Sequence, residues 1–170
     1  MSTERLVVDE QVADEFVTKF AARANELLAG DPAVNPACII GPMISPKSGA
    51  RINDLLQDAL DKGAKLVCGG VAADAVMPAT ILDHVKPDMK IYDEETFGPI
   101  TVVVRVNGAQ QAIEVANDSA YGLSSGVFGR DVNRALAVAM EMEYGSVHVN
   151  GATVQNEAQI SSPPTVDFST

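Results

Sequence analysis

The sequence predicts an α/β fold, a three-layer domain in which helices flank a mainly parallel sheet. Apolar segments of strand length alternate along the 170 residues with longer segments whose apolar residues recur at helical spacing. Glycines, prolines and capping residues stand at the borders between these segments. Residues 100–106, ITVVVRV, are almost continuously apolar, which is typical of a strand that is covered on both faces.

A short strand at residues 6–8 precedes the first predicted helix. Asp9 is suited to cap this helix, because its side chain can accept a hydrogen bond from a free backbone N–H group. Gly30 is suited to end it. The apolar residues at helical spacing are expected to face the core: Val12, Phe16, Phe20, Ala24 and Leu27.

A connection rich in proline and glycine, residues 31–46, leads to the second predicted helix. Ser45 is suited to cap this helix, Pro46 to occupy its first position and Gly63 to end it. Residues 65–68 then form a strand that a Gly-Gly pair closes. The helix is expected to turn these side chains inward: Ile52, Leu55, Leu56, Ala59 and Leu60.

The second half of the chain repeats the order of strand, helix and strand. Asn107 is expected to cap one helix and Asp131 another. The expected inner face of the first is Ala112, Ile113, Val115 and Ala116, and that of the second is Leu136, Ala137, Met140 and Met142. Strands are predicted at residues 79–85, 100–106, 125–128 and 146–150.

Composition and charge exclude several classes of function. Hydrophobic residues make up 46% of the chain and charged residues 21%, which is typical of a globular protein with a packed core. The net charge of -11 and the absence of a basic cluster argue against nucleic acid as a partner. Since the sequence contains neither a membrane-length apolar segment nor a secretory signal pattern, we expect a cytoplasmic protein without a membrane partner.

The cysteines and histidines do not form a recognisable catalytic or metal-binding pattern. Cys38 and Cys68 lack a CxxC motif and a neighbouring histidine, so we expect reduced thiols, without a zinc site or disulfide. Cys68 lies in an apolar strand and Cys38 has no basic neighbour, so neither is expected to be a nucleophile. His84 and His148 stand alone, and for His148, between two valines, a structural role is favoured over a proton shuttle.

The segment DEETFGPI, residues 93–100, places carboxylates beside an aromatic residue and a Gly-Pro turn. By local composition it is a solvated turn. The string EETFGP is, however, followed by ANDSAYGLSSGVFGRD and GSVHVNG, and preceded by GPMISPKSGARINDLLQDALDKGAKLVCGG. In this order, the strings resemble the C-terminal half of the catalytic domain of the aldehyde dehydrogenase family, and the resemblance covers residues 1–159.

The resemblance implies that Glu95 and Phe97 contact a nicotinamide cofactor, NAD or NADP. In the family, the glutamate of the E-x-F-G-P turn accepts hydrogen bonds from the nicotinamide-side ribose, and the aromatic residue packs near the nicotinamide ring. A carboxylate can accept bonds from two hydroxyls, and an aromatic face restricts the position of the ring. We expect both side chains at the carboxyl end of a sheet, with Glu94 as a solvated neighbour.

The segment NGATVQNEAQ, residues 150–159, corresponds to part of the substrate tunnel in the family. It is most similar to the branch that acts on aromatic aldehydes of the salicylaldehyde or vanillin type. Two interpretations of Thr153 and Val154 stay open. They line a pocket, or they belong to a loop that only covers the sheet.

The resemblance further implies a partial catalytic domain over residues 1–159, truncated at both ends, and an irregular tail over residues 160–170. The family's nucleophilic cysteine would precede Met1 and its dinucleotide-binding domain would lie upstream, so no catalytic residue is expected within the chain. The reaction of the family is thiolate attack on the aldehyde, hydride transfer to the cofactor and thioester hydrolysis. We expect the chain alone to be inactive and not to bind the cofactor stably.

Three interpretations of the whole chain stay open. It is a piece of an aldehyde dehydrogenase that works with an N-terminal partner, a non-catalytic binding or assembly module, or an inert truncated product. Apolar surfaces and sheet edges that the family covers with its other parts would be bare here. Such surfaces drive association, so we expect the chain to self-associate or to pair with the missing domain.

Overall fold

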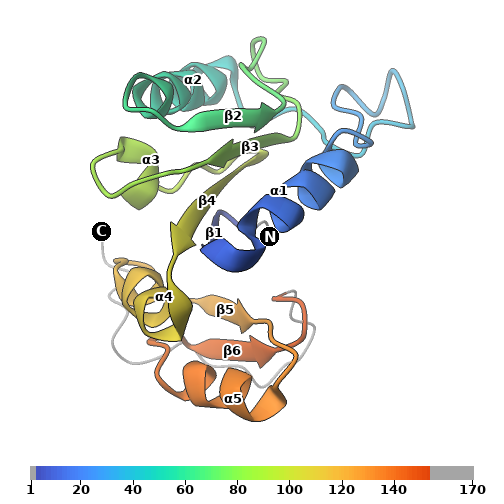
Figure 1. Cartoon of the computed structure of the whole chain (residues 1–170). Helices are drawn as coiled ribbons and strands as arrows, with labels where there is room; N and C mark the ends of the chain where they lie inside the picture. The colour runs from blue at the N-terminus through green and yellow to red at the C-terminus, as the bar shows by residue number, and fades with distance from the viewer. Residues whose placement is uncertain (1–2, 154–170) are drawn as a thin grey trace. The chain divides into compact units, whose positions relative to one another are not determined.

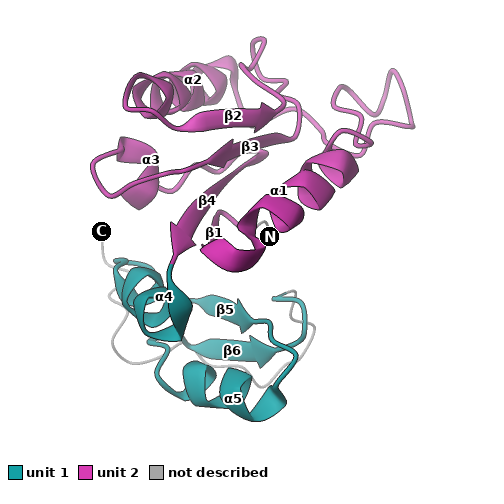
Figure 2. Ribbon diagram, viewed as in Figure 1, with its two compact units in different colours: residues 1, 107–170 teal, residues 2–106 magenta. Residues whose placement is uncertain are grey.

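The computed structural model describes residues 3–153, which form two compact units divided between Val106 and Asn107 (Figures 1 and 2). We name them the N-terminal unit, residues 3–106, and the C-terminal unit, residues 107–153. The sequence suggested one domain over residues 1–159.

The N-terminal unit contains a four-stranded sheet with the strand order β1-β4-β3-β2. The central pairs β1–β4 and β3–β4 are parallel and only β2 is antiparallel to its neighbour, which confirms the mainly parallel α/β fold. The elements of this unit are β1 (Arg5–Asp9), α1 (Glu10–Ala24), α2 (Pro46–Asp61), β2 (Lys65–Cys68), β3 (Thr80–Asp83), α3 (Lys90–Asp93) and β4 (Ile100–Val106).

The sheet is buried on both faces. Ile81 and Val103 belong to a core cluster with residues of α1, so α1 covers one face. Leu82 and Val102 are their neighbours along β3 and β4 and are also buried. Because successive side chains of a strand point to opposite faces, the second face is covered as well. The predicted near-continuous burial of β4 is therefore confirmed.

Local signals set the helix ends as the sequence predicted. The Asp9 side chain accepts a hydrogen bond from the backbone of Gln11 at the start of α1. Ser45 caps α2 in the same way, ahead of Pro46. Gly63 follows α2 with a positive φ of 96°, a conformation that favours glycine.

The predicted face of α1 is partly wrong. The helix ends at Ala24 rather than near Gly30, and its buried side chains are Ala13, Val17 and Ala24. Val12 is 54% exposed. Ala13 is fully buried against the sheet, so the helix is rotated by about one position from the orientation that its large apolar residues indicated.

The second helix agrees with its prediction. Ile52, Leu55, Leu56 and Ala59 are buried, and Leu60 is half-buried. The short helix α3, which contacts α2, was not predicted, because four residues are too few to show a helical period.

The C-terminal unit contains two parallel strands, β5 (Ser124–Val127) and β6 (Ser146–Val149), in which Ser124 lies opposite Ser146. Helix α5 (Val132–Met140) contacts both strands, and α4 (Gly108–Asn117) opens the unit. The predicted strand, helix, strand order is thus confirmed in the described part of this unit.

Two predictions for the helices of the C-terminal unit are wrong. Asn107 makes no side-chain cap bond at α4, and its backbone N–H instead donates to Gln111 Oε1 at 2.7 Å. In α5, Leu136 and Met140 are exposed and Ala135 is the buried residue. The short side chain of Ala135 permits close approach of α5 to the strands, which again overrides the pattern of large residues. Asp131 caps α5 as predicted.

No helix among residues 3–153 is both long enough and apolar enough to cross a lipid bilayer.

Candidate functional site

The predicted cofactor turn, residues 95–99, lies directly before β4 at an accessible place. Glu95 is exposed, and Phe97 is 77% exposed. The expected position at a carboxyl end of the sheet is wrong for the parallel strands. Since the turn leads straight into Ile100, the first residue of β4, it lies at the amino end of that strand and of its parallel neighbours.

Glu4 holds the turn from the start of β1. Its Oε2 accepts a hydrogen bond from the Thr96 backbone N–H at 2.8 Å, and its Oε1 accepts one from the Phe97 N–H at 3.1 Å. The position of Glu4 follows from strand pairing. Arg5 lies opposite Val102, and the Val102 N–H donates to the Glu4 carbonyl at 2.8 Å.

Arg51 holds the same turn from the first turns of α2. Its guanidinium donates to the backbone carbonyls of Glu95 at 3.2 Å and Thr96 at 2.6 Å. Two opposite charges thus bind the polar backbone groups of a single turn, carboxylate on the N–H side and guanidinium on the carbonyl side. Hydrogen bonds to charged groups are stronger than neutral ones, so the backbone here is firmly placed.

The conformation of the turn is strained and tightly packed. Phe97 has a positive φ of 50°, which is rare for a bulky residue and commonly occurs where the surroundings impose it. At Gly98, a Cβ atom would collide with Cδ1 of Ile52 and approach Met43 Sδ at 3.2 Å. A side chain at this position of the E-x-F-G-P string would have to displace the end of the Ile52 side chain of α2, which favours glycine here.

The Glu95 side chain accepts no hydrogen bond from residues 3–153, so its acceptor capacity is available to a ligand. Partial burial, and next the negative charge of Glu4, raise the pKa of the Glu95 carboxyl, and Arg51 offsets part of this effect. Hydroxyl donors from a ligand would stabilise the ionised carboxylate in this place.

Arg5 supports the segment just before the turn. Its guanidinium donates to the Tyr92 carbonyl and stacks over the Tyr92 ring, with Cζ 4.1 Å from the ring centroid. It also lies 3.9 Å from the Asp93 carboxylate. Sequence reasoning missed Glu4, Arg5 and Arg51, because each contacts backbone groups that are far away in the sequence.

The second predicted site falls in the other unit. Thr153 is half-buried in the C-terminal unit, close to Gly126 of β5. Val154 lies outside the described residues.

Neither cysteine has the surroundings of a nucleophile. Cys68 is buried, its thiol donates to the Ala79 carbonyl, and burial raises its pKa. Cys38 is a half-buried free thiol. His148 lies 3.2 Å from the Ser146 hydroxyl. Within residues 3–153, no three side chains of the types His, Cys, Asp and Glu are grouped to hold a metal ion.

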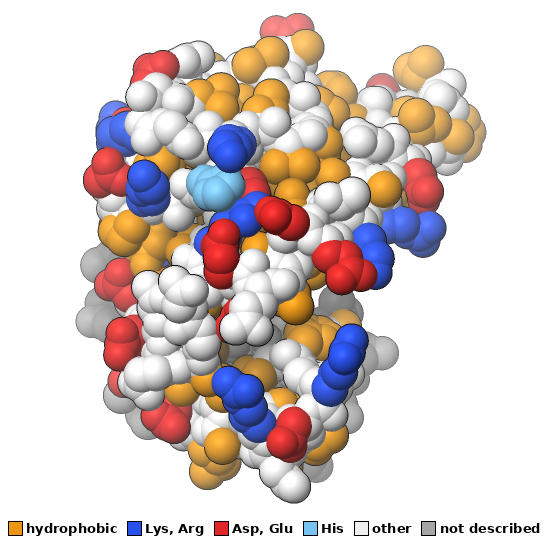
Figure 3. All heavy atoms as spheres, in the orientation of Figure 1, with side chains coloured by type: hydrophobic (Ala, Val, Ile, Leu, Met, Phe, Trp, Pro, Cys, Tyr) orange, Lys and Arg blue, Asp and Glu red, His pale blue; other side chains and the backbone are white. Residues whose placement is uncertain are grey.

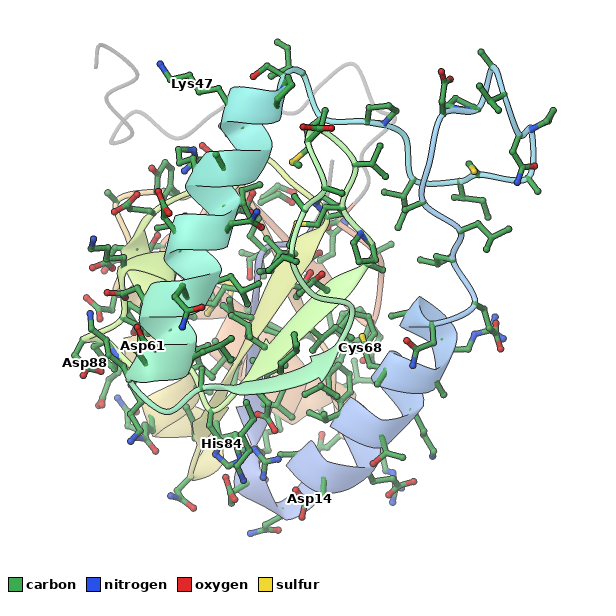
Figure 4. All side chains as sticks on the ribbon, turned by 90° about the horizontal axis from the view of Figure 1, so that it is seen from above. Asp14, Lys47, Asp61, Cys68, His84 and Asp88 are labelled. Carbon is green, nitrogen blue, oxygen red and sulfur yellow. The ribbon has the colours of Figure 1, made fainter. Side chains whose placement is uncertain are left out.

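The carboxyl edge of the same sheet carries a denser charge cluster. Arg105 of β4 donates to Asp83 at 2.7 and 3.0 Å and lies 3.2 Å from Glu10 and 2.8 Å from Asp14 of α1. His84 Nε2 is 3.6 Å from Asp83. On the face of the N-terminal unit drawn in Figure 3, acidic and basic side chains surround a histidine, and Figure 4 shows His84 and Asp14 at the same end of this unit.

Comparison with known proteins identifies the family. A sequence model described as "Aldehyde dehydrogenase family" matches residues 1–162. A salicylaldehyde dehydrogenase of Pseudomonas putida is 71% identical over 159 residues, which are 94% of this chain and 33% of that protein. A vanillin dehydrogenase of Pseudomonas fluorescens is 48% identical over 160 residues, which are again 94% of this chain and 33% of that protein. The predicted resemblance to the salicylaldehyde and vanillin branch is thus confirmed.

Solved structures of dehydrogenases also match this chain. A salicylaldehyde dehydrogenase from Pseudomonas putida G7, complexed with salicylaldehyde, matches with a TM-score of 0.90 and 68% identity, over 94% of this chain and 33% of that chain. An NADP-dependent glyceraldehyde-3-phosphate dehydrogenase from Bacillus halodurans C-125, complexed with NADP, matches with a TM-score of 0.85 and 35% sequence identity. The match covers 91% of this chain and 32% of that chain. The chain spans about a third of the length of these relatives. The E-x-F-G-P turn is accessible and is held at the amino end of β4. By the match of its sequence, this chain belongs to the aldehyde dehydrogenase family.

Proposed function

We propose that this chain supplies part of the catalytic domain of an NAD(P)-dependent aldehyde dehydrogenase that oxidises an aromatic aldehyde to the carboxylic acid. The observation that carries the proposal is the turn before β4. There, one strained and clamped stretch of backbone presents an accessible ring, Phe97, and an accessible carboxylate, Glu95, that accepts no hydrogen bond from residues 3–153.

The proposed roles follow from the chemistry of these two side chains. Glu95 accepts hydrogen bonds from the hydroxyls of the nicotinamide-side ribose. Phe97 limits the positions of the nicotinamide ring by packing against it. Glu94 is exposed and stays a solvated neighbour. When bound, the cofactor would accept the hydride that leaves the aldehyde.

Neither Cys38 nor Cys68 serves as the nucleophile in this proposal. Cys68 is a buried thiol with a raised pKa, which makes a poor nucleophile, and Cys38 has no basic neighbour in the sequence to stabilise a thiolate. The proposed thiolate therefore comes from outside the two cysteines of this chain, and the chain alone is expected to be inactive.

An aromatic aldehyde is proposed as the substrate class. Support comes from the relatives named above, a salicylaldehyde dehydrogenase at 71% identity and a vanillin dehydrogenase at 48%. Thr153, together with Val154, is proposed to line the aldehyde pocket. A hydroxyl next to an aliphatic side chain suits a substrate that combines an aromatic ring with polar substituents.

A chimaeric enzyme tests the proposal. Residues 1–159 of this chain would replace the homologous third of the Pseudomonas putida salicylaldehyde dehydrogenase. With salicylaldehyde as substrate, we expect the chimaera to form reduced nicotinamide nucleotide. The absorbance of the reduced nucleotide measures the reaction. A chimaera that keeps the circular dichroism and assembly state of the parent enzyme, yet oxidises neither salicylaldehyde, vanillin nor benzaldehyde, would contradict the proposal.

Substitution of Glu95 sharpens this test. In the chimaera, Glu95→Gln is expected to raise the KM for the nucleotide roughly tenfold or more, because hydrogen bonds to a charged acceptor contribute about 1.5–3 kcal/mol. Glu94→Gln, the same change at the neighbouring exposed carboxylate, is the matched control and should leave that KM unchanged. Equal effects of the two variants would remove Glu95 from the proposed site.

We further propose that the chain self-associates in the cytoplasm. Large apolar side chains are exposed on α1 and on the segment that follows it, among them Val12, Leu28, Val34, Ile39 and Ile44. Both cysteines are free thiols, in keeping with a reducing compartment. Sedimentation velocity is expected to show mass increasing with concentration, and a monomer at every concentration would refute self-association.

A further inference from the structure

We infer that Glu4 is a positioning residue for the nicotinamide-binding turn, whose carboxylate sets the backbone of Thr96 and Phe97 so that the Phe97 ring and the Glu95 carboxylate face the cofactor. The inference rests on the proposed function. Glu4 itself makes no proposed contact with the cofactor or the substrate and acts through the turn.

The geometry of Glu4 matches a two-point clamp. Its two carboxylate oxygens accept one bond each, from the N–H groups of two successive residues, at 2.8 and 3.1 Å. Each bond uses a different oxygen, so the observed arrangement depends on a side chain with two acceptor atoms. Glutamine has a single acceptor oxygen, and its NH₂ group would meet a backbone donor.

The clamp acts on the strained residue directly. A positive φ is unfavourable for a bulky residue, so neighbouring contacts must impose the conformation. Arg51 bonds the two carbonyls before Phe97, and Ile52 closes on Gly98 after it. Of these contacts, only the Glu4 bond is made to Phe97 itself.

Glu4 is fixed to the sheet on which the turn depends. Its carbonyl accepts from the Val102 N–H, and the Thr3 carbonyl accepts from the Thr101 hydroxyl at 2.9 Å. The backbone of Glu4 therefore moves with β4, the strand that the turn begins. The carboxylate therefore connects the start of β1 to the turn.

The first arm of the test measures the clamp in the 170-residue chain itself. Amide hydrogen exchange, resolved by NMR, is compared between the wild-type chain, Glu4→Gln and the control Glu94→Gln. We expect Glu4→Gln to speed exchange at Phe97 and Thr96 roughly tenfold or more, because a charge-assisted bond is lost. The amides of β3 should change little, and Glu94→Gln should leave Phe97 unchanged.

The second arm measures the consequence for the cofactor in the chimaera. Glu4→Gln is expected to raise the KM for NAD(P) roughly tenfold and to leave the KM for the aldehyde nearly unchanged. A purely structural role would lower the active fraction, and hence the apparent kcat, without changing either KM. Should Glu4→Gln fail to fold, Glu4→Asp keeps the charge, shortens the reach by one methylene, and should show a smaller rise of the same KM.

The outcomes separate the two proposals. A wild-type chimaera that folds but is inactive overturns the proposed function, whatever the exchange data show. An active wild-type chimaera, in which Glu4→Gln and Glu4→Asp change neither the nucleotide KM nor the exchange of Phe97, overturns the positioning role alone.

Discussion

The two edges of the sheet in the N-terminal unit use charge in opposite ways. At the carboxyl edge, Arg105 is surrounded by the carboxylates of Asp83, Glu10 and Asp14. At the amino edge, Glu4 and Arg51 bind backbone groups of the turn instead of each other. The first edge has the closer ion pairs, and the second has the exposed ring and a carboxylate that accepts no hydrogen bond within residues 3–153.

The difference shows why charge density alone is a poor guide to a binding site. At the carboxyl edge, the hydrogen bonds that Arg105 donates to Asp83 raise the pKa of Arg105, and the charged groups pair with one another within the fold. Ion-pair networks of this kind perturb pKa values without binding a ligand. At the amino edge, the charges hold a turn, and within residues 3–153 the acceptors of the Glu95 side chain stay available to a ligand. Four predictions test this contrast.

The largest effect is expected at the carboxyl edge. Asp83→Asn removes the charge that Arg105 binds with two hydrogen bonds in a nearly buried place. Because Arg105 then keeps only the exposed carboxylates of Glu10 and Asp14 among residues 3–153, the loss of its buried partner should lower the free energy of unfolding by about 3 kcal/mol. Urea denaturation measures it. The control Glu15→Gln breaks an exposed ion pair with Lys19. It should lower the free energy of unfolding by only a small fraction of the loss expected for Asp83→Asn. Equal costs would mean that the cluster is not a structural anchor.

The next effect concerns packing at the amino edge. Gly98→Ala places a methyl group against Cδ1 of Ile52 and should destabilise the chain by about 1–2 kcal/mol through overpacking. Gly41→Ala, where a Cβ meets no atom, is the control. The double variant Gly98→Ala/Ile52→Val lacks the colliding Cδ1 and should recover part of the loss, so additive costs in denaturation would refute the predicted collision.

A smaller effect should follow pH at the carboxyl edge. Burial alone would raise the pKa of Asp83, but hydrogen bonds from Arg105 and from the His84 backbone outweigh it, and the folded pKa is lowered. The carboxylate thus stabilises the fold above its unfolded pKa of about 4, and this contribution is lost as pH falls through the folded pKa. The difference in unfolding free energy between wild type and Asp83→Asn should shrink from pH 6 to about pH 3. A difference independent of pH would contradict this assignment.

The smallest effect is expected at Thr96, whose buried hydroxyl has no hydrogen-bond partner among the described residues. Thr96→Val should leave stability unchanged or raise it by about 1 kcal/mol, because an unsatisfied hydroxyl is removed. Thr80 is equally buried, but its hydroxyl bonds to Gly70 and Pro78. Thr80→Val should therefore destabilise the chain. Thermal unfolding of both variants measures the contrast, and a loss at Thr96 would mean that its hydroxyl has a partner.

Elements with strong local signals were predictable. The caps Asp9, Ser45 and Asp131 and the strand β4 agree with their predictions, because side-chain caps and apolar runs act over a few residues. The buried faces of α1 and α5 were not predictable. Their large apolar residues indicated one orientation, whereas the close packing of each helix against its strands at Ala13 and Ala135 required another.

The candidate site was predictable only in part. Glu95 and Phe97 follow from a short string, and the structure makes them accessible. The Glu4 clamp was missed, because Glu4 and Thr96 are 92 residues apart and only strand pairing brings them together. The edge of the sheet was assigned wrongly for a simpler reason. A turn that runs straight into a strand must lie at that strand's amino end.

By itself, the order of residues determined the α/β class, the helix caps and the identity of the side chains that the turn presents, since each depends on neighbours within a few positions. Tertiary structure decided which helix faces are buried, which edge of the sheet carries the turn, and how Glu4 and Arg51 hold it. These features depend on the pairing of β1 with β4 and on the approach of α2 to Gly98. Contacts between residues distant in sequence leave no local pattern, and hydrogen bonds to backbone groups can be made to any residue type.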